Sequence, residues 1–356
     1  MKILYDYQAF NQHHGGVSRY HVELIKNLRQ IGIECSVPFL FSENVYLDEI
    51  HVSHIDLFSK WNNSLKRNGM KWFNQRVCLH AMSHQKYDIF HPTFLNPYYI
   101  GQSKGKPVVQ TMHDLNHEKF ALYKVENIIE KRRKVLADAT HIIAISEQTK
   151  RDLMEIHGVD EKRITVVYHG IGQNIYSTVA HRLFERPYLL YVGGRSGYKN
   201  FGTFLCGFAR LKEEIDLVCT GMLFNTEERQ LISDLRLTNR IHQRFVTNEQ
   251  MNQLMAQAVA FVYPSRAEGF GMPILEAFRC GCPCIISDIP CFHEVAGQAA
   301  RYFNPNEIED IASTLESVMN DGKTLSELIQ SGFERMKLFS WERTAKETLK
   351  VYQSVL

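Results

Sequence analysis

AFVYPSRAEGFGMPILEAFRCG, residues 260–281, contains the three parts of a strand–turn–helix unit in one stretch. Its first residues, Ala260 to Tyr263, are apolar throughout, as in a strand that is covered on both faces. Pro273 suits a first helical position and Gly281 the position just past a helix end, which predicts a short helix from Pro273 to about Cys280. The stretch therefore predicts one unit of a parallel α/β sheet.

The same rhythm of apolar run, glycine-bearing turn and amphipathic segment recurs on both sides of this unit. A helix is predicted from Val17 to Gln30, ended by Gly32. Two doubly wound parallel sheets explain the pattern better than one continuous sheet, because a second series of strands starts after a polar gap. The predicted strands are 3–5, 89–90, 108–111, 141–145 and 165–168 in the first series, and 188–192, 217–220, 260–263 and 284–287 in the second.

The polar stretch Gly172 to Arg186 lacks apolar periodicity and is typical of a linker. We therefore expect an N-terminal domain over residues 1–172 and a C-terminal domain over residues 173–340. Residues 341–356 are helix-like with no strand after them, and could dock on the first domain as a terminal helix. Because open α/β sheets bind ligands at the carboxyl ends of their strands, the ligand should lie in a cleft between the two sheets.

Composition excludes several classes of protein. The 356 residues carry 41 Lys plus Arg and 39 Asp plus Glu, and this formal charge of +2 argues against a nucleic-acid binder. Neither an apolar signal core nor a run of about 18 apolar residues occurs, so the protein is expected to stay in the cytosol. The eight cysteines should be reduced thiols. Four of them are clustered without the spacing of a zinc site, which favours buried structural thiols: Cys280, Cys282, Cys284 and Cys291.

The turn Glu268-Gly269-Phe270-Gly271 precedes the predicted helix and is a candidate anion site. Free N–H groups at a helix N-terminus and the helix dipole both favour a phosphate. Glu268 lies before the turn and Glu276 is expected on the first helical turn, so both carboxylates can border one pocket. Their oxygens suit the vicinal hydroxyls of a ribose or a hexose. Alternatively, Glu276 balances the helix N-terminus and Glu268 is solvated.

A second candidate cluster, Gly193 to Asn200, follows the first strand of the second sheet. Arg195 offers a fork of donors and Lys199 a point charge to a diphosphate. An exposed loop would have the same pattern. The chain contains no Asp-x-Asp motif, so we predict no metal site and expect Arg195, Lys199 and the helix amides to stabilise the charge instead.

Glu268 and Glu276, with seven residues between them in EGFGMPILE, resemble the Glu-x7-Glu motif of retaining glycosyltransferases of family 4. The resemblance covers essentially the whole chain and implies the GT-B fold, which is two Rossmann-like domains facing a cleft. It also implies that Glu276 holds the donor ribose and that Glu268 contacts the transferred sugar. Arg195 and Lys199 match the family's Arg and Lys that neutralise the leaving diphosphate.

The resemblance implies roles for further residues. By itself, the sequence at Gly15 and Gly16 predicts a tight turn. In the family this loop also touches the donor phosphates and the acceptor. His113 follows a predicted strand and would reach the donor sugar, although a single His there is as often a satisfied loop residue. The expected catalytic residues are His113, Glu268, Arg195 and Lys199; the donor-binding residues are Gly15, Gly16, Gly194, Gly221, Val246, Glu268, Gly269, Phe270, Gly271 and Glu276; the acceptor side is His91, Asp114 and Ser146.

The base of the donor is expected against Thr220-Gly221 and Phe245-Val246, next to a capping box that opens a helix at Thr247-x-x-Gln250. The N-terminal stretch and the Glu-x7-Glu block look most like bacterial O-antigen and capsule mannosyltransferases. The resemblance therefore favours a hexosyltransferase that uses GDP-mannose in lipopolysaccharide synthesis, with UDP-sugars still open. The nucleotide sugar is a substrate, and no further cofactor is expected.

The acceptor is expected to be a glycan or lipid-linked glycan, with peripheral contact at the inner face of the cell membrane. Basic and aromatic side chains could attract anionic lipid there, at about 1 kcal/mol per charge. Equally, they could be solvated helix faces. The residues concerned are Lys60, Trp61, Lys66, Arg67, Lys71, Trp72 and Phe73, and the run Lys131 to Lys134.

Rival functions share parts of these motifs. A nucleotide-sugar epimerase has the same fold class but needs no acceptor. A glycosidase could use Glu268 and Glu276 as acid and nucleophile, although the glycine turn between them argues against this. A dinucleotide oxidoreductase is disfavoured because neither glycine turn reads G-x-G-x-x-G with an acidic residue about 20 positions later. The non-enzymatic alternative is a protein that binds a sugar nucleotide without transferring the sugar.

Overall fold

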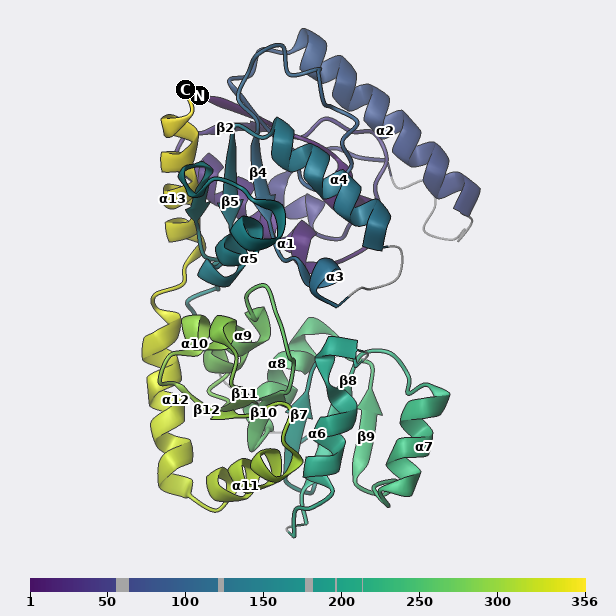
Figure 1. Ribbon diagram of the computed structural model, residues 1–356, viewed down its shortest axis with the longest axis vertical. Coiled ribbons are helices and arrows are strands. Elements are labelled where there is room, and N and C mark those ends of the chain that lie inside the picture. The colour runs from purple at the N-terminus through teal and green to yellow at the C-terminus, as the bar shows by residue number, and fades with distance from the viewer. Residues whose placement is uncertain (56–63, 121–124, 177–181, 196, 213) are drawn as a thin grey trace. The chain divides into compact units, whose positions relative to one another are not determined.

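The computed structural model describes residues 1–55, 64–120, 125–176, 182–195, 197–212 and 214–356 (Figure 1). The chain divides into two compact units. Unit 1 contains Met1–Gly170 together with Trp341–Leu356, and unit 2 contains Ile171–Ser340. The terminal segment is thus grouped with the first unit, although the whole of unit 2 separates it from that unit in the sequence.

Unit 1 is built on six short parallel strands. They form two three-stranded groups, ordered β2-β1-β3 and β4-β5-β6, and a parallel bridge between Phe90 and Val108 connects β3 to the start of β4. Three of these strands are buried at nearly every position, as expected for a sheet covered on both faces. The strands are β1 Lys2–Tyr5, β2 Glu34–Ser36, β3 Ile89–His91, β4 Val109–Met112, β5 His141–Ala144 and β6 Ile164–Val166.

Helices cover this sheet, and the terminal helix is one of them. Helix α13 packs against α1. The hydroxyl of Tyr352 on α13 lies 2.8 Å from that of Tyr5 on β1, and Thr344 donates to the carbonyl of Tyr168 at 2.7 Å. The helices are α1 Gly16–Gln30, α2 Ser64–His84, α3 Asn116–Lys119, α4 Val125–Asp138, α5 Glu147–His157 and α13 Trp341–Ser354, with short 3-10 helices at Gln8–Asn11, Leu47–Ile50 and Glu161–Arg163.

Unit 2 contains a single parallel sheet of six strands in the order β12-β11-β10-β7-β8-β9. The chain enters at β7, runs outward to β9 and then returns to β10 on the other side of β7. The order of the strands therefore reverses between β7 and β10. The strands are β7 Tyr188–Tyr191, β8 Asp216–Thr220, β9 Ile241–Arg244, β10 Ala260–Tyr263, β11 Cys284–Ser287 and β12 Ala300–Phe303.

The described part of unit 2 also contains seven α-helices and one 3-10 helix, and the last two α-helices follow the final strand. They are η4 Gly197–Lys199, α6 Phe201–Phe208, α7 Thr226–Asp234, α8 Asn248–Gln257, α9 Met272–Arg279, α10 Pro290–Ala296, α11 Ile308–Met319 and α12 Gly322–Met336. Glycines allow two pairs of helices to approach closely. A Cβ on Gly207 of α6 would lie 2.5 Å from Ile311 of α11, and one on Gly332 of α12 would lie 2.7 Å from Phe278 of α9.

The structure confirms the predicted α/β class and most of the predicted strands. Helix α9 starts at Met272, one residue earlier than expected, and Gly281 beyond it has φ +64°. Strand β6 begins one residue earlier than expected and ends two residues earlier. Three strands were not predicted: β2, β9 and β12. Each has only one or two fully buried residues, so its apolar pattern is weak.

The close approach of α6 and α11 predicts the effect of two glycine substitutions. Gly207→Ala should lower the free energy of unfolding by about 1–3 kcal/mol, because the new methyl group overlaps the buried Ile311 side chain. Gly202→Ala on the same helix meets only Leu231 at 3.5 Å and should be neutral or slightly stabilising. Urea denaturation of both variants would measure the difference, and equal stabilities would contradict the proposed overlap.

Candidate functional site

The reversal of strand order in unit 2 defines a candidate ligand site. Open α/β sheets bind ligands where the strand order reverses, at the carboxyl ends of the two central strands. Here these strands are β7 and β10, which pair in parallel. The residues after β7 lead to Lys199, and the residues after β10 lead to Glu268. The two polar clusters singled out in the sequence therefore meet at one edge of the sheet.

Lys199 and Glu268 form an ion pair at this edge. The Nζ of Lys199 lies 2.6 Å from Oε1 of Glu268, and their side chains are 22% and 11% exposed. The ammonium group also lies 5.6 Å from the centre of the Tyr263 ring. Burial, and then the negative charge of Glu268, hold the pKa of the Tyr263 hydroxyl well above 10.0. Glu268 is therefore paired, which contradicts the alternative that it is simply solvated.

The turn before α9 depends on Gly271. This residue adopts φ +102°, and a Cβ there would meet Ile274 at 3.1 Å and Phe292 at 3.2 Å, so only glycine fits. The helix that follows has Pro273, which carries no N–H, in its first turn, and the N–H of Ile274 donates to the carbonyl of Gly271 at 2.9 Å. The positive end of the helix dipole lies at this turn.

Glu276 is the fifth residue of α9, because the helix starts at Met272, one residue earlier than predicted. The first turn of α9 therefore contains no acidic residue. The Glu276 side chain is partly buried.

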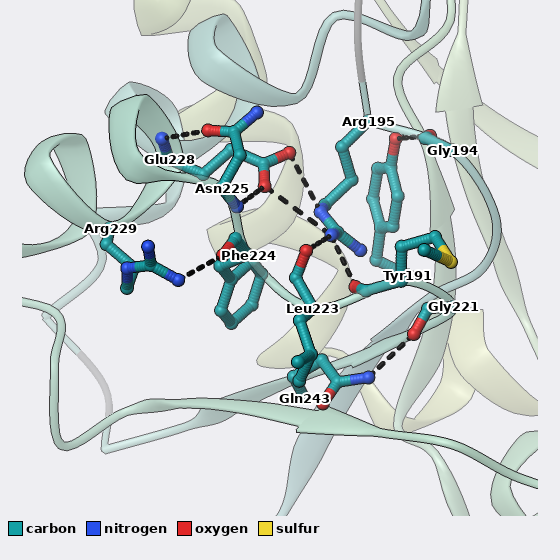
Figure 2. A network of polar contacts seen from close by, with 11 residues as sticks. Tyr191, Gly194, Arg195, Gly221, Leu223, Phe224, Asn225, Glu228, Arg229 and Gln243 are labelled. Atoms are coloured by element: carbon teal, nitrogen blue, oxygen red, sulfur yellow. Dashed lines mark hydrogen bonds and ion pairs between the residues drawn. The ribbon is translucent and has the colours of Figure 1, made fainter.

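Arg195 does not extend into solvent toward a ligand. Its side chain is 4% exposed, and Figure 2 shows it at the centre of a polar network. Its Nε donates to Oε1 of Glu228 at 2.9 Å, and its Nη2 donates to the carbonyls of Met222 and Leu223 at 2.5 and 3.0 Å. The third nitrogen of the guanidinium group, Nη1, is buried and has no hydrogen-bond partner.

The ends of β7, β8 and β9 are connected by further hydrogen bonds. The Tyr191 hydroxyl donates to the carbonyl of Gly194 at 2.7 Å, and Gln243 donates to the carbonyl of Gly221 at 2.6 Å (Figure 2). Gly221 has φ +103°, and a Cβ there would lie 3.2 Å from the carbonyl oxygen of Gly193. The predicted capping box after Val246 is present, with Thr247 and Gln250 each bonding the other's backbone N–H.

In unit 1, the glycine loop and His113 lie near the carboxyl ends of strands. Gly15 is the N-cap of α1, and Gly16 is its first residue, with open space where a Cβ would be. His113 follows β4 and lines a cavity of about 260 Å³ together with Asp114 and Phe94. Burial lowers the pKa of His113 to about 4, so the imidazole is neutral at pH 7.

Two residues predicted for the acceptor side belong instead to the core of unit 1. His91 has no exposed surface; its Nδ1 lies 2.6 Å from the Tyr352 hydroxyl and its Nε2 lies 2.9 Å from the Thr111 hydroxyl. Ser146 is also fully buried and caps α5 by accepting the N–H of Thr149 at 3.0 Å. Neither residue lines the cavity beside His113.

The predicted membrane patches are only partly described. Lys60 and Trp61 lie outside the described residues, as do the side chains of Lys66 and Arg67. Trp72 and Phe73 on α2 are about half exposed, beside the exposed Lys71. In the second patch Arg132 is 4% exposed and paired with Glu118, so it is not a surface charge. None of the described helices is long and apolar enough to span a membrane.

The cysteines are unpaired thiols, as the sequence predicted. The four clustered ones are buried, and three of them donate to backbone carbonyls, which supports the structural interpretation. In the described part of the chain, no three or more His, Cys, Asp or Glu side chains are grouped so as to hold a metal ion.

Two side chains at the site were missed in the sequence. Tyr263, the last residue of β10, was read only as part of an apolar strand. Glu228 forms a capping box with Asn225 at the start of α7. The N-x-x-E pattern before an amphipathic segment was visible and could have placed Glu228 at a helix start. No sequence pattern near residue 228 predicts its ion pair with Arg195.

Two family models match the chain. Residues 14–173 match the model described as "Glycosyltransferase Family 4", and residues 180–335 match the model described as "Glycosyl transferases group 1". The first match lies mostly in unit 1 and the second lies in unit 2.

Relatives with described activities are similar at low identity. O-antigen chain mannosyltransferase RfbU of Salmonella typhimurium is 30% identical over 183 residues, which is half of this chain and half of RfbU. O-antigen chain mannosyltransferase B of Escherichia coli is 25% identical over 99% of this chain and 100% of the relative. Among solved structures, Anabaena HepE in complex with UDP and glucose has a TM-score of 0.79 at 18% identity, covering 99% of this chain and 100% of HepE. This likeness confirms the predicted GT-B fold.

The buried histidines of unit 1 predict a loss of stability in mild acid. Burial lowers the pKa of His91 to about 3 and that of His113 to about 4, from 6.5. Between pH 6.5 and about 4 the unfolded chain binds protons that the folded unit does not. The contribution of these histidines to the free energy of unfolding is therefore fully present above pH 6.5. It falls as the pH falls below that value, by up to about 1.4 kcal/mol per pH unit for each histidine.

Thermal unfolding between pH 7.5 and 5 would measure this loss, in a range where most carboxylates remain ionised. The variant His91→Gln should have a shallower pH dependence than the native chain, whatever its absolute stability. The exposed His84 on α2 offers a matched control, since His84→Gln should keep the native slope. Identical slopes in all three proteins would show that His91 is not held neutral.

Proposed function

Because the chain belongs to the glycosyltransferases, with a family 4 domain followed by a group 1 domain, we propose that it transfers mannose from GDP-mannose with retention of configuration. The acceptor is a glycan or lipid-linked glycan in the synthesis of a surface polysaccharide. Unit 2 binds the nucleotide sugar, and unit 1 binds the acceptor.

One observation supports this function most directly: the Lys199–Glu268 ion pair at the strand reversal, beside the N-terminus of α9. A cation next to a helix N-terminus suits a diphosphate. A carboxylate at the same point suits the hydroxyls of a sugar attached to that diphosphate. When the donor binds, Lys199 can exchange Glu268 for the phosphate, which leaves Glu268 to accept hydrogen bonds from the sugar.

In the proposed reaction, an acceptor hydroxyl attacks the anomeric carbon on the face from which the diphosphate leaves. The bond from the anomeric carbon to the phosphate oxygen breaks, and this oxygen takes the proton of the attacking hydroxyl. No side chain in the sequence stands out as a covalent nucleophile. The protein then has two tasks, which are to orient the two substrates and to stabilise negative charge on the nucleotide. Lys199 and the first N–H groups of α9 perform the second task.

We assign the neutral imidazole of His113 to the task of orienting the two substrates. At pH 7 it can donate one hydrogen bond and accept another without adding a charge beside the reacting carbon. It lines the cavity at the carboxyl ends of β3 and β4, and Asp114 lines the same cavity. We assign this cavity to the acceptor side, in place of His91 and Ser146.

The identity of the donor rests on the relatives. RfbU and mannosyltransferase B are both named O-antigen chain mannosyltransferases, which favours GDP-mannose. A UDP-sugar is the alternative donor. A protein that binds the nucleotide sugar without transferring it is the alternative function. All three possibilities use the same site in unit 2, so a binding experiment and a transfer experiment are both needed.

Calorimetric titration with GDP, UDP, GDP-mannose and UDP-glucose, in the presence of EDTA, tests the donor site. GDP and GDP-mannose should bind without metal. Glu276→Ala should weaken binding about tenfold or more, because it removes a charged acceptor from the ribose hydroxyls. Lys199→Gln should weaken binding of the diphosphates by a similar factor.

The exposed Glu309 on α11 provides the control, since Glu309→Ala removes the same charge from a surface ion pair with Arg210. Binding of the uridine nucleotides and not of the guanosine nucleotides would mean that the donor is a UDP-sugar. Binding of none of the four would contradict the assignment of the site. The bound donor is then used in a transfer assay with a lipid-linked glycan acceptor. The product should have the anomeric configuration of the donor, as read by NMR, whereas inversion would refute the retaining mechanism.

Peripheral contact with the membrane is the second part of the proposal with a direct test. Trp72 and Phe73 on α2 are exposed beside Lys71, which places two aromatic side chains and a basic one together at the surface. The protein should sediment with vesicles that contain anionic lipid at low salt. The double variant Trp72→Ala/Phe73→Ala should sediment severalfold less. Ile156→Ala, which removes an exposed apolar side chain from α5, should behave as the native chain. No sedimentation of the native chain would rule out this contact.

A further inference from the structure

The cavity in unit 1 has the size and the walls of a site for one sugar ring. It is lined by β4, by the segments that follow β3 and β4, and by residues of α1 and α4. Its volume of about 260 Å³ is about nine times the share of one water molecule in the liquid. Small-molecule sites are mostly apolar, with a few polar groups that fix the orientation of the ligand. The apolar lining residues here are Val17, Phe94, Leu95, Met112 and Ile128.

Four other lining residues each carry a buried polar atom that has no hydrogen-bond partner among the described residues. The atoms are Oε1 of Gln110, Nε2 of His113, Nδ1 of His117 and Nε of Arg132. Buried polar groups in native proteins are nearly always bonded, because an unpaired one has lost its bond to water without a replacement. Four such atoms around one cavity therefore indicate a polar ligand.

Gln110 is held so that only its oxygen is left for a ligand. The residue lies on β4 and is 1% exposed. Its Nε2 donates to the carbonyls of Thr111 at 3.0 Å and Pro92 at 3.4 Å. The reverse orientation of the amide would place its oxygen against these two carbonyl oxygens, so the hydrogen bonds assign the nitrogen to this side. Oε1 can only accept, and it requires a donor from the ligand.

Arg132 on α4 offers the complementary group. Its side chain is 4% exposed, and its Nη1 pairs with the carboxylate of Glu118, which is equally buried. The pair neutralises the positive charge of Arg132, but the Nε–H remains without a partner. Arg132 therefore provides a hydrogen-bond donor without adding an uncompensated charge.

The charges of the lining balance, which favours an uncharged ligand. Among the described lining residues, Asp114 is acidic and Lys131 is basic, and Glu118 neutralises Arg132. Burial lowers the pKa of His113 to about 4, so its imidazole adds no charge at pH 7. A phosphate or carboxylate would meet no excess positive charge here. A sugar hydroxyl, in contrast, can donate to an amide oxygen and accept from a guanidinium N–H.

We propose that this cavity binds an uncharged pyranose, the terminal sugar of the acceptor glycan, and that Gln110 and Arg132 recognise its hydroxyl groups. Gln110 accepts a hydrogen bond from one hydroxyl, and Arg132 donates to another. This inference rests on the proposed function, because it names the part of the acceptor that unit 1 binds. A lipid phosphate without a sugar lacks these hydroxyls, so an earlier glycosyl transfer must supply the acceptor.

Titration with methyl glycosides of mannose, glucose and galactose, without a nucleotide, tests the site directly. The NMR signals of the His113 ring, which lines the cavity, should shift with at least one of these uncharged hexosides. They should not shift with glucuronate or inorganic phosphate. Gln110→Leu should weaken hexoside binding about tenfold, because it removes the buried acceptor. No shift with any hexoside, or a shift with phosphate or glucuronate alone, would overturn the proposal.

Arg132→Lys separates recognition of the sugar from the ion pair. It keeps a positive charge beside Glu118 but removes the Nε–H donor, so hexosides should bind about tenfold more weakly. Arg163→Lys is the matched control, since Arg163 is in the same unit and donates to the carbonyls of Leu136 and Ala139 outside the cavity. It should bind hexosides as the native chain does. Equal losses in the two variants would mean that Arg132 acts only on stability.

The transfer assay tests the role of the cavity in the reaction. Gln110→Leu and Arg132→Lys should raise the KM for the glycan acceptor about tenfold and leave the KM for the donor unchanged. An acceptor that ends in a hexuronic acid, or a lipid diphosphate without a sugar, should be used at least about tenfold less efficiently than one with an uncharged terminal sugar. Equal use of either would overturn the proposal. If the chain transferred no sugar from any donor, the proposed function would fail, and hexoside binding would still decide what the cavity holds.

Discussion

The reversal of strand order between β7 and β10 is the constraint on which the candidate site depends. The two strands pair in parallel, so the segments that follow them start from the same edge of the sheet. This places Lys199 within 2.6 Å of Glu268, although 69 residues separate them in the chain. The same edge receives the N-terminus of α9 through the turn at Gly271. A cation, a carboxylate and a helix N-terminus are thus brought to one edge of the sheet by topology.

Two ion pairs lie at this edge. The side chains of Lys199 and Glu268 are 22% and 11% exposed, and those of Arg195 and Glu228 are 4% and 15% exposed. Arg195 and Glu228 each also bond the backbone of the loop after β8. Both pairs are largely withdrawn from solvent, so separating either one without a replacement partner costs more than separating a surface pair. A bound diphosphate would supply that replacement to Lys199.

Unit 1 shows that a polar residue at a strand end need not belong to a site. His91 ends β3 and His113 follows β4, and both were predicted as site residues for that reason. The structure encloses His91 between Tyr352 and Thr111, whereas His113 lines a cavity. The partner that accounts for His91 comes from α13 at the other end of the chain. No local pattern around residue 91 contains that information.

The sequence by itself determined the α/β class, most strands, the bounds of α9 to within one residue and the motif that identifies the glycosyltransferase family. These features depend on local periodicity, on proline and glycine at helix ends, and on a short run of residues. Only the tertiary structure decided which charges pair. Arg195 and Lys199 lie four residues apart, and both carry a charge that suits a phosphate. Arg195 pairs with Glu228, 33 residues later, and Lys199 pairs with Glu268, 69 residues later, because parallel strands bring distant segments to a common edge.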